Sequence, residues 1–473
     1  MRSSGRCSCT MLAWVLLMVT TSPHIKAQDN VPTWSCVDEV EKHVIWSCEH
    51  GVCVTPPVLH GDRVLVGTRT PYRASQELGL LLCLDSNDGQ VIWQASHPKL
   101  PARANDMLGA CGKPIIAGRR VYYQSNRGEL MCVDIAGFGN GNDGPYRDEP
   151  ATGMNDADIV WKLDMIEQLG IFKRDAGDVA NPLPCPLVVG DMVYCVTGNG
   201  GKFDSIPKPD APSFIAVDKL TGAVLWSSNA PGKEICHGQW SSPVTAKIDG
   251  EQVIIFPGGD GRLYGFEPLH GKPLWSVDCN DADAQSWRVP RLDSNRKGLR
   301  NFFVATPTVV DTMLFVGTSH EYEFRGGQKW PVFAIDLQKA HRKENAIHWK
   351  YAKEQFGGTF GSVAADGELL YVWDYDGYLI ALDRSSGREL WRADTVEGAG
   401  YFASPTVHQG KVFVGTEEGH LCIYSTGRTK QFLGRFDFGE PVSGDPVFAG
   451  DRMYITTIRA TWAVRMPGEL LVH

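Results

Sequence analysis

The sequence predicts an all-β protein, an eight-bladed β-propeller, and three observations lead to this fold class. A turn-and-tryptophan phrase recurs along the chain, a hairpin phrase alternates with it, and an aromatic residue returns at a matching place in each repeat. A supersecondary unit that repeats about every 40–50 residues is typical of propellers and solenoids. Each repeat would form one four-stranded blade that packs only on its neighbours.

The turn-and-tryptophan phrase places an acidic residue eight positions before a tryptophan. Its copies are Cys83-Leu84-Asp85…Gly89…Trp93, Ala216-Val217-Asp218…Gly222…Trp226, Ala381-Leu382-Asp383…Gly387…Trp391 and, more weakly, Gly265-Phe266-Glu267…Gly271…Trp275. The acid can accept backbone N–H groups of the turn, and the glycine supplies the positive φ that closes it. A short strand then leads to the tryptophan, which we expect to be buried between neighbouring blades.

The hairpin phrase consists of turn residues followed by β-branched or aromatic residues, and counting it gives eight blades. It occurs at residues 61–66, 118–123, 190–195, 250–255, 311–316, 367–372, 410–414 and 450–455. The aromatic residues that close the blades are Trp46, Trp93, Trp161, Trp226, Trp275, Trp349, Trp391 and, at the matching place in the seventh repeat, Phe436. The first of these precedes the first hairpin, and no closing strand follows the last hairpin, which ends in residues 461–464. We therefore expect the N-terminal strand at 44–46 to complete the C-terminal blade, which removes free sheet edges.

Four segments are predicted along the chain. Residues 1–27 resemble a secretory signal peptide, because Arg2 and Arg6 precede the short apolar stretch 11–19 and the small residue Ala27 ends the segment. Residues 28–43 are then an N-terminal lead-in, 44–466 the propeller, and 467–473 a C-terminal tail. No run of 18 apolar residues occurs and no lipobox precedes Cys36, so we expect a secreted or periplasmic protein without a transmembrane helix.

Charge and cysteine content narrow the possible partners. The leader contains Arg2, Arg6 and Lys26, so the remaining chain has 43 basic and 55 acidic side chains, a net charge of −12. Such a protein binds nucleic acid poorly.

Eleven cysteines remain, and an odd number leaves at least one thiol unpaired. Disulfides could involve Cys48, Cys53, Cys111, Cys185, Cys195, Cys236 and Cys279, in pairings that the sequence leaves open. Small core positions are expected for Cys83, Cys132 and Cys422.

The Ala-x-Asp-x-x-x-Gly-x-x-x-Trp phrase resembles the tryptophan-docking repeat of the pyrroloquinoline quinone (PQQ) propeller superfamily. That superfamily includes the quinoprotein alcohol dehydrogenases and the non-enzymatic outer-membrane assembly factor BamB. The resemblance covers about residues 44–466 and implies eight blades. WD-repeat and kelch propellers are poorer matches, because neither of their signature patterns recurs here.

The resemblance implies a test for dehydrogenase chemistry. Those enzymes carry a Thr-Gly-Asn-Pro phrase whose Asn binds calcium beside the quinone, and a His-Asp-x-Trp-Asp phrase that supplies the general base. This chain has Thr197-Gly198-Asn199-Gly200 and His237-Gly238-Gln239-Trp240-Ser241. Asn199, His237 and Trp240 match, but Gly238 and Ser241 replace the two acids, and no adjacent cysteine pair occurs. Oxidation of an alcohol needs a base near the reacting carbon, so we expect this chemistry to be lost.

We therefore predict ligand contacts at the mouth of the central channel for Asn199, His237 and Trp240. We predict no catalytic residue and no metal-binding residue in this chain. Each has a structural alternative. Asn199 could hold a left-handed turn, His237 could be a hydrogen-bonded residue at a loop-to-strand junction, and Trp240 could pack against the next blade. Aromatic residues are expected to line this mouth and to suit a flat ligand or a peptide: Trp240, Phe360, Tyr401 and Phe402.

Two functions follow as hypotheses. The first is a non-catalytic binding or scaffold protein, similar in role to BamB, that recognises a protein or polymer partner through the channel mouth and loops. Under this hypothesis we expect a monomer without a cofactor. The alternative is a divergent PQQ-dependent oxidoreductase of the alcohol dehydrogenase type. It would bind PQQ with calcium and would take its base from Asp106, Asp178 or Glu440.

Overall fold

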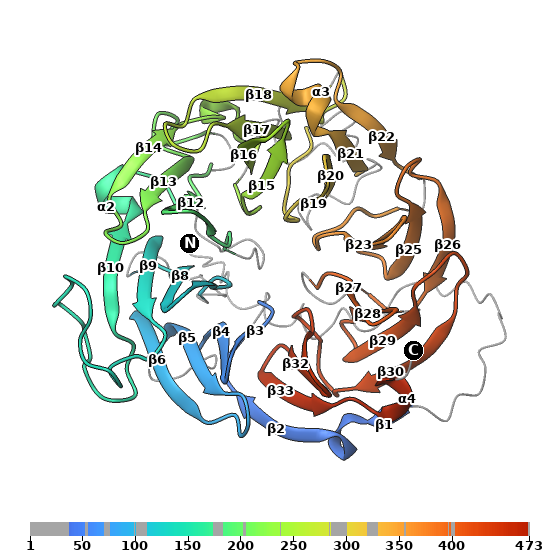
Figure 1. Ribbon diagram of the computed structural model, residues 1–473, viewed down its shortest axis with the longest axis horizontal. Coiled ribbons are helices and arrows are strands. Elements are labelled where there is room, and N and C mark those ends of the chain that lie inside the picture. The colour runs from blue at the N-terminus through green and yellow to red at the C-terminus, as the bar shows by residue number, and fades with distance from the viewer. Residues whose placement is uncertain are drawn as a thin grey trace, which may run out of the picture. The chain divides into compact units, whose positions relative to one another are not determined.

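The structure is a computed structural model in which residues 37–473 form one compact unit. It describes residues 37–52, 55–70, 76–98, 100, 111–173, 183–201, 205–236, 238–282, 284, 300–318, 330–353, 356–395, 397–398 and 403–471. Eight antiparallel sheets follow one another around a common centre, which confirms the predicted eight-bladed β-propeller (Figure 1). The predicted signal peptide and most of the lead-in lie outside the described residues.

Each blade is built from four strands that lie side by side, the first nearest the centre of the ring and the fourth at its rim (Figure 1). Blades 1 and 2 are β3 (Val58–His60), β4 (Arg63–Arg69), β5 (Leu78–Asp85) and β6 (Val91–Pro98), then β7 (Ile115–Ala117), β8 (Arg120–Gln124), β9 (Glu129–Asp134) and β10 (Ile159–Asp164). Blades 3 and 4 are β11 (Leu187–Val189), β12 (Met192–Val196), β13 (Phe214–Asp218) and β14 (Val224–Ser228), then β15 (Val244–Ile248), β16 (Glu251–Pro257), β17 (Arg262–Phe266) and β18 (Pro273–Asp278).

The second half of the ring repeats this arrangement. Blades 5 and 6 are β19 (Thr308–Val310), β20 (Met313–Gly317), β21 (Val332–Asp336) and β22 (Ile347–Tyr351), then β23 (Ala364–Asp366), β24 (Leu369–Trp373), β25 (Tyr378–Asp383) and β26 (Glu389–Asp394). Blade 7 contains β27 (Thr406–His408), β28 (Lys411–Gly415), β29 (His420–Ser425) and β30 (Phe432–Asp437), and blade 8 contains β31 (Val447–Ala449), β32 (Arg452–Thr456) and β33 (Ala460–Arg465).

Helices are short and lie in the connections. They are the 3₁₀ helices η1 (Val40–Lys42) and η2 (Gly232–Glu234) and the α-helices α2 (Met165–Leu169), α3 (Leu337–His341) and α4 (Gly468–Leu471). Asp164 caps α2 by accepting the N–H groups of Ile166 and Glu167, and Gly170 ends it in a left-handed conformation. Within the part of the chain that the structure describes, no helix has the length and apolar character needed to cross a membrane.

Blade 8 is completed by the N-terminal strand β2 (Val44–Glu49), as the sequence predicts. β2 pairs antiparallel with β33, with Trp46 opposite Ala463 and Cys48 opposite Thr461. The side-chain ring of His50 adds a hydrogen bond to Thr461 across the same seam. Strands more than 400 residues apart are thereby joined, and the loop-closure entropy is tolerable because it grows only logarithmically with length.

Blade 7 departs from the prediction in two ways. A short strand, β1 (Val37–Glu39), adds to its rim and pairs in parallel with β30, so the sheet has five strands. The residue that takes the tryptophan place is Gly434, because Gly434 lies opposite Ile423 just before the register shift, as Trp391 lies opposite Ala381 in blade 6. The assignment of Phe436 to this place is therefore wrong. The turn before β30 is one residue longer than in blade 6, which moves the register.

A repeated contact, here called the tryptophan latch, joins most blades to the next. The indole N–H donates to a backbone carbonyl in the following blade's turn, in the pairs Trp46–Ser86 (2.9 Å), Trp93–Ile135 (2.8 Å), Trp161–Lys219 (3.0 Å), Trp226–Pro268 (2.7 Å), Trp349–Arg384 (3.0 Å) and Trp391–Gly427 (2.9 Å). The expected burial is confirmed, since the exposed fractions of Trp93, Trp226, Trp275 and Trp391 are 8% or less. The turn acids act as predicted, with the Asp218 carboxylate accepting the N–H groups of Leu220 and Thr221.

The turn glycines serve a second purpose that the sequence pattern alone does not reveal. Gly222 and Gly271 have φ angles of 72° and 65°. A Cβ atom on Gly222 would lie 2.5 Å from the Trp161 indole, and one on Gly271 would lie 2.4 Å from the Trp226 indole. The glycine therefore provides both the left-handed turn and a flat surface for the indole of the preceding blade.

Gly271→Ala is expected to cost clearly more stability than Gly190→Ala. Both glycines have positive φ, so each substitution loses about 1–2 kcal/mol from the left-handed backbone. A Cβ on Gly190 meets nothing within 4 Å, whereas a Cβ on Gly271 would displace the Trp226 indole. Urea unfolding of the two variants measures the difference. Equal losses of stability would contradict the role of Gly271 as the seat of the latch.

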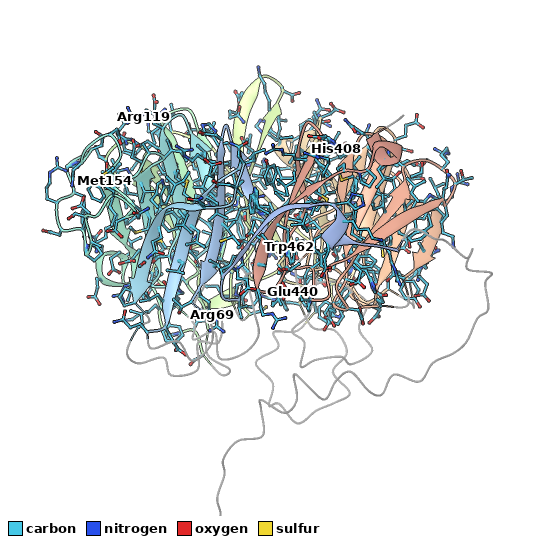
Figure 2. All side chains as sticks on the ribbon, turned by 90° about the horizontal axis from the view of Figure 1, so that it is seen from below. Arg69, Arg119, Met154, His408, Glu440 and Trp462 are labelled. Atoms are coloured by element: carbon cyan, nitrogen blue, oxygen red, sulfur yellow. The ribbon has the colours of Figure 1, made fainter. Side chains whose placement is uncertain are left out.

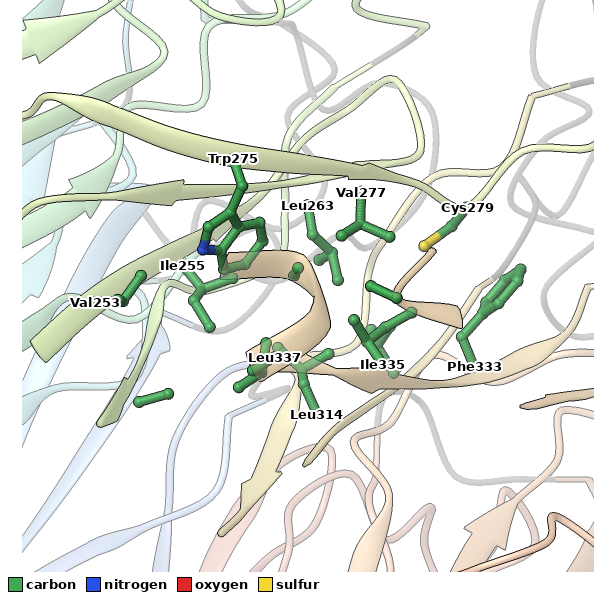
Figure 3. Close-up of a cluster of buried hydrophobic side chains, with 14 of the residues drawn as sticks. Val253, Ile255, Leu263, Trp275, Val277, Cys279, Leu314, Phe333, Ile335 and Leu337 are labelled. Atoms are coloured by element: carbon green, nitrogen blue, oxygen red, sulfur yellow. The ribbon is translucent and has the colours of Figure 1, made fainter. Parts of the chain in front are cut away.

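The hydrophobic core consists of separate clusters between neighbouring blades. Figure 3 shows the cluster between blades 4 and 5, in which Trp275, Leu263 and Val277 face Leu314 and Ile335. Helix α3 replaces the usual turn in blade 5, and its Leu337 and Ala340 pack into this cluster. The indole N–H of Trp275 has no hydrogen-bond partner in the described part of the chain, so this latch rests on packing alone.

Eight cysteines of the described residues are free thiols. They are Cys48, Cys83, Cys111, Cys132, Cys185, Cys195, Cys279 and Cys422. The pairs Cys185/Cys195 and Cys236/Cys279, which the sequence left open as disulfides, are therefore not formed. Burial raises the pKa of the Cys83, Cys111 and Cys132 thiols to about 12, so they remain protonated and act as small apolar residues. Cys53 lies outside the described residues.

Candidate functional site

The predicted site residues Asn199 and Trp240 lie on one face of the ring, here called the loop face. It carries the connections between the second and third strands of each blade and those from each fourth strand to the next blade. Figure 2 shows Arg69 and Glu440 toward this face and Arg119, Met154 and His408 toward the opposite one, here called the turn face. Asn199 follows β12 and Trp240 precedes β15, so the fold brings both to the loop face. His237 lies outside the described residues.

Asn199 is fully buried, and its side chain binds backbone groups of two connections. Its Oδ1 accepts the N–H of Phe172 (2.9 Å), and its Nδ2 donates to the carbonyl of Lys208 (2.9 Å). The left-handed conformation belongs to Gly198, with φ of 75°, so the alternative in which Asn199 itself takes it is wrong. The carboxamide holds the 172–173 and 205–211 connections together in place of a regular strand pair.

Gln239 links Asn199 to the Trp240 connection. Its Nε2 donates to the carbonyl oxygen of Asn199 (2.8 Å), while its Oε1 is buried without a hydrogen-bond partner in the described residues. An unpaired buried acceptor is costly, so this oxygen is a candidate contact for a donor from a ligand or from an undescribed connection. Sequence reasoning passed over Gln239, and nothing in the repeat pattern distinguished it from a spacer residue.

Trp240 is the half-buried end of an aromatic cluster. Its ring meets that of Phe302 edge-to-face at 5.5 Å, and Phe302 lies 6.4 Å from the Trp330 ring. Phe302 precedes the first strand of blade 5, so the alternative in which Trp240 packs toward the next blade is confirmed. Phe302 and Trp330 are buried, whereas Trp240 is half-buried. The cluster thus presents one tryptophan on a rigid apolar base, which suits recognition of an apolar or aromatic group.

A second aromatic pair on the loop face includes the predicted Phe360. Its ring lies 5.2 Å from that of Tyr375 in an edge-to-face arrangement, and both side chains are half-buried. Tyr401 and Phe402, the other predicted aromatic residues, lie outside the described residues. Aromatic pairs therefore occur in the described part of the loop face in blades 4 to 6, and their role in lining a channel mouth stays a prediction.

In several blades, the residue two positions before the first strand forms a hydrogen bond with the residue at the same place in a neighbouring blade. Ser242 Oγ accepts the Cys185 N–H, Ser404 Oγ accepts the Ser362 N–H, and Asp445 Oδ1 accepts the Ser404 N–H. The sequence carries a signal for these links, because a small or polar residue stands before a proline at this place in several repeats, as in Ser242-Pro243 and Asp445-Pro446. These links fix the connections around the centre of the ring.

Several carboxyl groups near the loop face are buried. Desolvation raises the pKa of Asp260 to about 6, that of Asp374 to about 7 and that of Asp445 to about 6. Asp260 is the better-defined case, since its oxygens accept the Tyr264 hydroxyl (2.7 Å) and the Arg262 N–H (3.2 Å). Among the described residues, no group of three or more His, Cys, Asp or Glu side chains is arranged to hold a metal ion.

Asp260→Asn is expected to flatten the pH dependence of stability. The pKa of Asp260 is higher in the folded than in the unfolded chain, so the folded state binds more protons between about pH 4 and pH 6 and loses stability as the pH rises. The amide carries no charge, its oxygen can still accept the Arg262 N–H, and its NH2 group can donate to the Tyr264 hydroxyl oxygen in place of the bond that Asp260 accepts. Urea unfolding should therefore show little change at pH 4 and a gain of roughly 2–3 kcal/mol at pH 8. A variant with wild-type pH dependence would contradict this assignment.

Glu440, a candidate base under the enzyme hypothesis, already forms hydrogen bonds through both carboxylate oxygens. Its two carboxylate oxygens accept the Thr457 hydroxyl and the Arg459 side chain, the latter at 2.6 Å. The Ser241 hydroxyl, in place of an acid of the dehydrogenase phrase, donates to the carbonyl of Ala305 (2.7 Å). Asp106 and Asp178 lie outside the described residues.

The ring of eight blades, the tryptophan latches and the closure by an N-terminal strand define a PQQ-like β-propeller. The family model described as outer membrane protein assembly factor BamB matches residues 25–141, 151–300, 325–431 and 376–464. The chain belongs to this family.

Individual relatives agree with this assignment at low identity. A BamB of Yersinia pestis is 22% identical over 442 residues, which cover 91% of each chain. A BamB of Alkalilimnicola ehrlichii is 27% identical over 217 residues, 46% of this chain and 48% of that protein, so the match spans about half of that relative.

Solved structures share the fold. BamB from Moraxella catarrhalis superposes with a TM-score of 0.59 at 14% identity, over 89% of this chain and 99% of that one. A europium-containing methanol dehydrogenase gives a TM-score of 0.58 at 12% identity, over 91% and 94%. At these identities the likeness concerns the fold alone, so the two functional hypotheses must be separated by the residues of the loop face.

Proposed function

We propose that this protein is a secreted or periplasmic binding and scaffold protein without catalytic activity, and that it acts in outer membrane protein assembly. The observation that carries the proposal is which groups the side chains at the predicted site bind. The Asn199 carboxamide and the Ser241 hydroxyl bind backbone groups, whereas Trp240 is a half-buried aromatic residue in a cluster with Phe302. The family supports the assembly role, and the partner is expected to be a protein.

The residues present do not fit the quinone and calcium of the dehydrogenases. Calcium takes about six to eight oxygen ligands, usually with carboxylates among them. Here Gly238 and Ser241 replace the acids, and the Asn199 oxygen already accepts the Phe172 N–H. We therefore propose that the protein works without PQQ or calcium.

Site-specific photo-crosslinking in intact cells tests the binding role of the loop face. A benzophenone amino acid at position 240 is expected to crosslink a partner protein, because Trp240 is the half-buried end of the aromatic cluster on the loop face. The matched control is position 154 on the turn face, where Met154 is 71% exposed. Partner crosslinks at 154 but not at 240, or at neither position, would contradict the proposal.

A further inference from the structure

The closure of the ring contains a histidine whose side chain contacts both blades that the closing strand joins. His50 directly follows β2. Its Nδ1 lies 2.7 Å from the carbonyl oxygen of Gly51 and 3.1 Å from the hydroxyl of Thr68, which belongs to β4 in blade 1. Its Nε2 lies 2.9 Å from the hydroxyl of Thr461, which belongs to β33 in blade 8. One imidazole therefore links β2, blade 1 and blade 8.

The groups around this imidazole select its neutral form. A carbonyl oxygen only accepts hydrogen bonds, so the short contact with Gly51 assigns the proton to Nδ1. Nε2 then carries no proton, and the Thr461 hydroxyl donates to it. Thr461 is fully buried, and in the part of the chain that the structure describes its hydroxyl has no other hydrogen-bond partner. The neutral imidazole therefore satisfies both hydrogen bonds of the seam.

A second proton on His50 disrupts this arrangement. Nε2 becomes a donor, so the Thr461 hydroxyl has to turn and accept, and its own hydrogen is left without an acceptor in a buried place. An unpaired buried donor is costly. Desolvation of the ring acts in the same direction and lowers the pKa of His50, although the Gly51 carbonyl and Glu440 favour the charged form.

The charged groups of the elements packed against the seam compensate little. They are Glu49 in β2, Arg69 in β4, Glu440 ahead of blade 8 and Arg459 in its last turn. Glu440 acts on the His50 ring, but its two carboxylate oxygens already accept the Thr457 hydroxyl and the Arg459 side chain. Among the described residues, no carboxylate forms a hydrogen bond with the His50 ring, so a charge on this ring is poorly stabilised.

We propose that His50 makes the closure of the ring sensitive to acid, because the seam between β2 and β33 is held firmly by the neutral imidazole and opens more readily when the imidazole is protonated. In the opened seam the ring reaches water and takes up the proton at the ordinary histidine value of 6.5. The folded pKa is lower, so the stabilisation is present above about pH 6.5 and is lost progressively as the pH falls toward the folded value. This property belongs to the closure and does not depend on the binding role proposed for the loop face.

Hydrogen exchange of the full mature protein at about pH 7.5 and about pH 5.5 tests the proposal, after correction for the intrinsic pH dependence of exchange. Opening in the fragments 44–50 and 460–465 is expected to increase several-fold at the lower pH, up to about tenfold, because opening takes up one proton below the ordinary histidine pKa. Strands far from the seam, such as β12 and β13, should keep their protection. Unchanged protection of the two fragments, or an equal loss in all blades, would overturn the proposal.

Two neutral replacements show whether His50 causes the change. His50→Gln and His50→Asn cannot take up the proton, so the acid-dependent opening of the seam should disappear. The matched control is His60→Gln, since His60 is an exposed histidine at the end of β3 in blade 1 and its variant should keep the wild-type response. Acid-dependent opening that persists in a folded His50 variant would overturn the assignment.

NMR of the histidine rings in the wild-type protein provides a measurement that does not rely on folding of the variants. His50 should titrate below the ordinary histidine value, and its Nδ1 should carry the proton in the neutral form. Titration at or above that value, or a proton on Nε2 in the neutral form, would overturn the proposal.

Discussion

Trp226→Ala is expected to destabilise the ring by about 3–5 kcal/mol, the usual loss for a buried large aromatic side chain. Trp226 is 8% exposed, and its indole lies on Gly271 and donates to the carbonyl of Pro268. The truncation leaves a cavity between blades 3 and 4 and an unsatisfied carbonyl. Trp391→Ala should act in the same way on blades 6 and 7. Thermal or urea unfolding measures the change, and a nearly unchanged melting temperature for either variant would contradict the latch.

The hydrogen bond can be separated from the packing by replacing tryptophan with phenylalanine. In Trp226→Phe the contact with Gly271 remains but the bond to Pro268 is lost, at a cost of about 1 kcal/mol or more. Trp275 is the matched control, since its N–H has no partner in the described residues. Trp275→Phe should therefore be milder than Trp226→Phe. The reverse order would show that the indole hydrogen bond is not part of the latch.

Removal of residues 28–50 is expected to cause loss of the monomeric fold. Without β2 the edge of β33 is exposed, and the packing of Trp46 between blades 8 and 1 disappears. An open edge of this kind is a template for aggregation. Size-exclusion chromatography and thermal unfolding of the truncated protein test this expectation. A monomer with wild-type stability would refute the closure.

A shorter deletion provides the control for this experiment. Removal of residues 28–39 takes away β1 but leaves β2 in blade 8 and η1 at the start of its connection. The rim of blade 7 then loses only the parallel strand on β30, so the loss of stability should be smaller and the protein should stay monomeric. Equal damage from both deletions would move the closing role from β2 to β1.

The repeat architecture could be predicted because its information is local and recurs. The acid, the glycine and the tryptophan recur within each hairpin, the acid holds its own turn and the tryptophan is buried against the next blade, so the number of blades and the closure of the ring were accessible from sequence. Where a repeat decays, this advantage disappears. Ser425 replaces the acid in blade 7 and the turn is longer, which led to Phe436 being assigned to the place that Gly434 occupies.

The contacts of the loop face were less accessible, because they occur once and join distant segments. Asn199 binds backbone groups of Phe172 and Lys208, and Trp240 packs on Phe302, so each contact joins segments that lie far apart in the sequence. Sequence reasoning identified these residues through a phrase shared with the dehydrogenases. Their partners come from connections of irregular length, where neither periodicity nor spacing indicates which backbone group lies nearby.

The central claim is that this propeller binds partners and does not oxidise alcohols, and one measurement tests it most directly. Purified mature protein is mixed with calcium and PQQ, and dye reduction is followed with simple alcohols while the melting temperature is recorded. Neither dye reduction nor a rise in melting temperature is expected, because the acids of the dehydrogenase phrase are replaced by Gly238 and Ser241. Alcohol-dependent dye reduction that disappears in a folded Asn199→Ala variant would contradict the account and establish the enzyme.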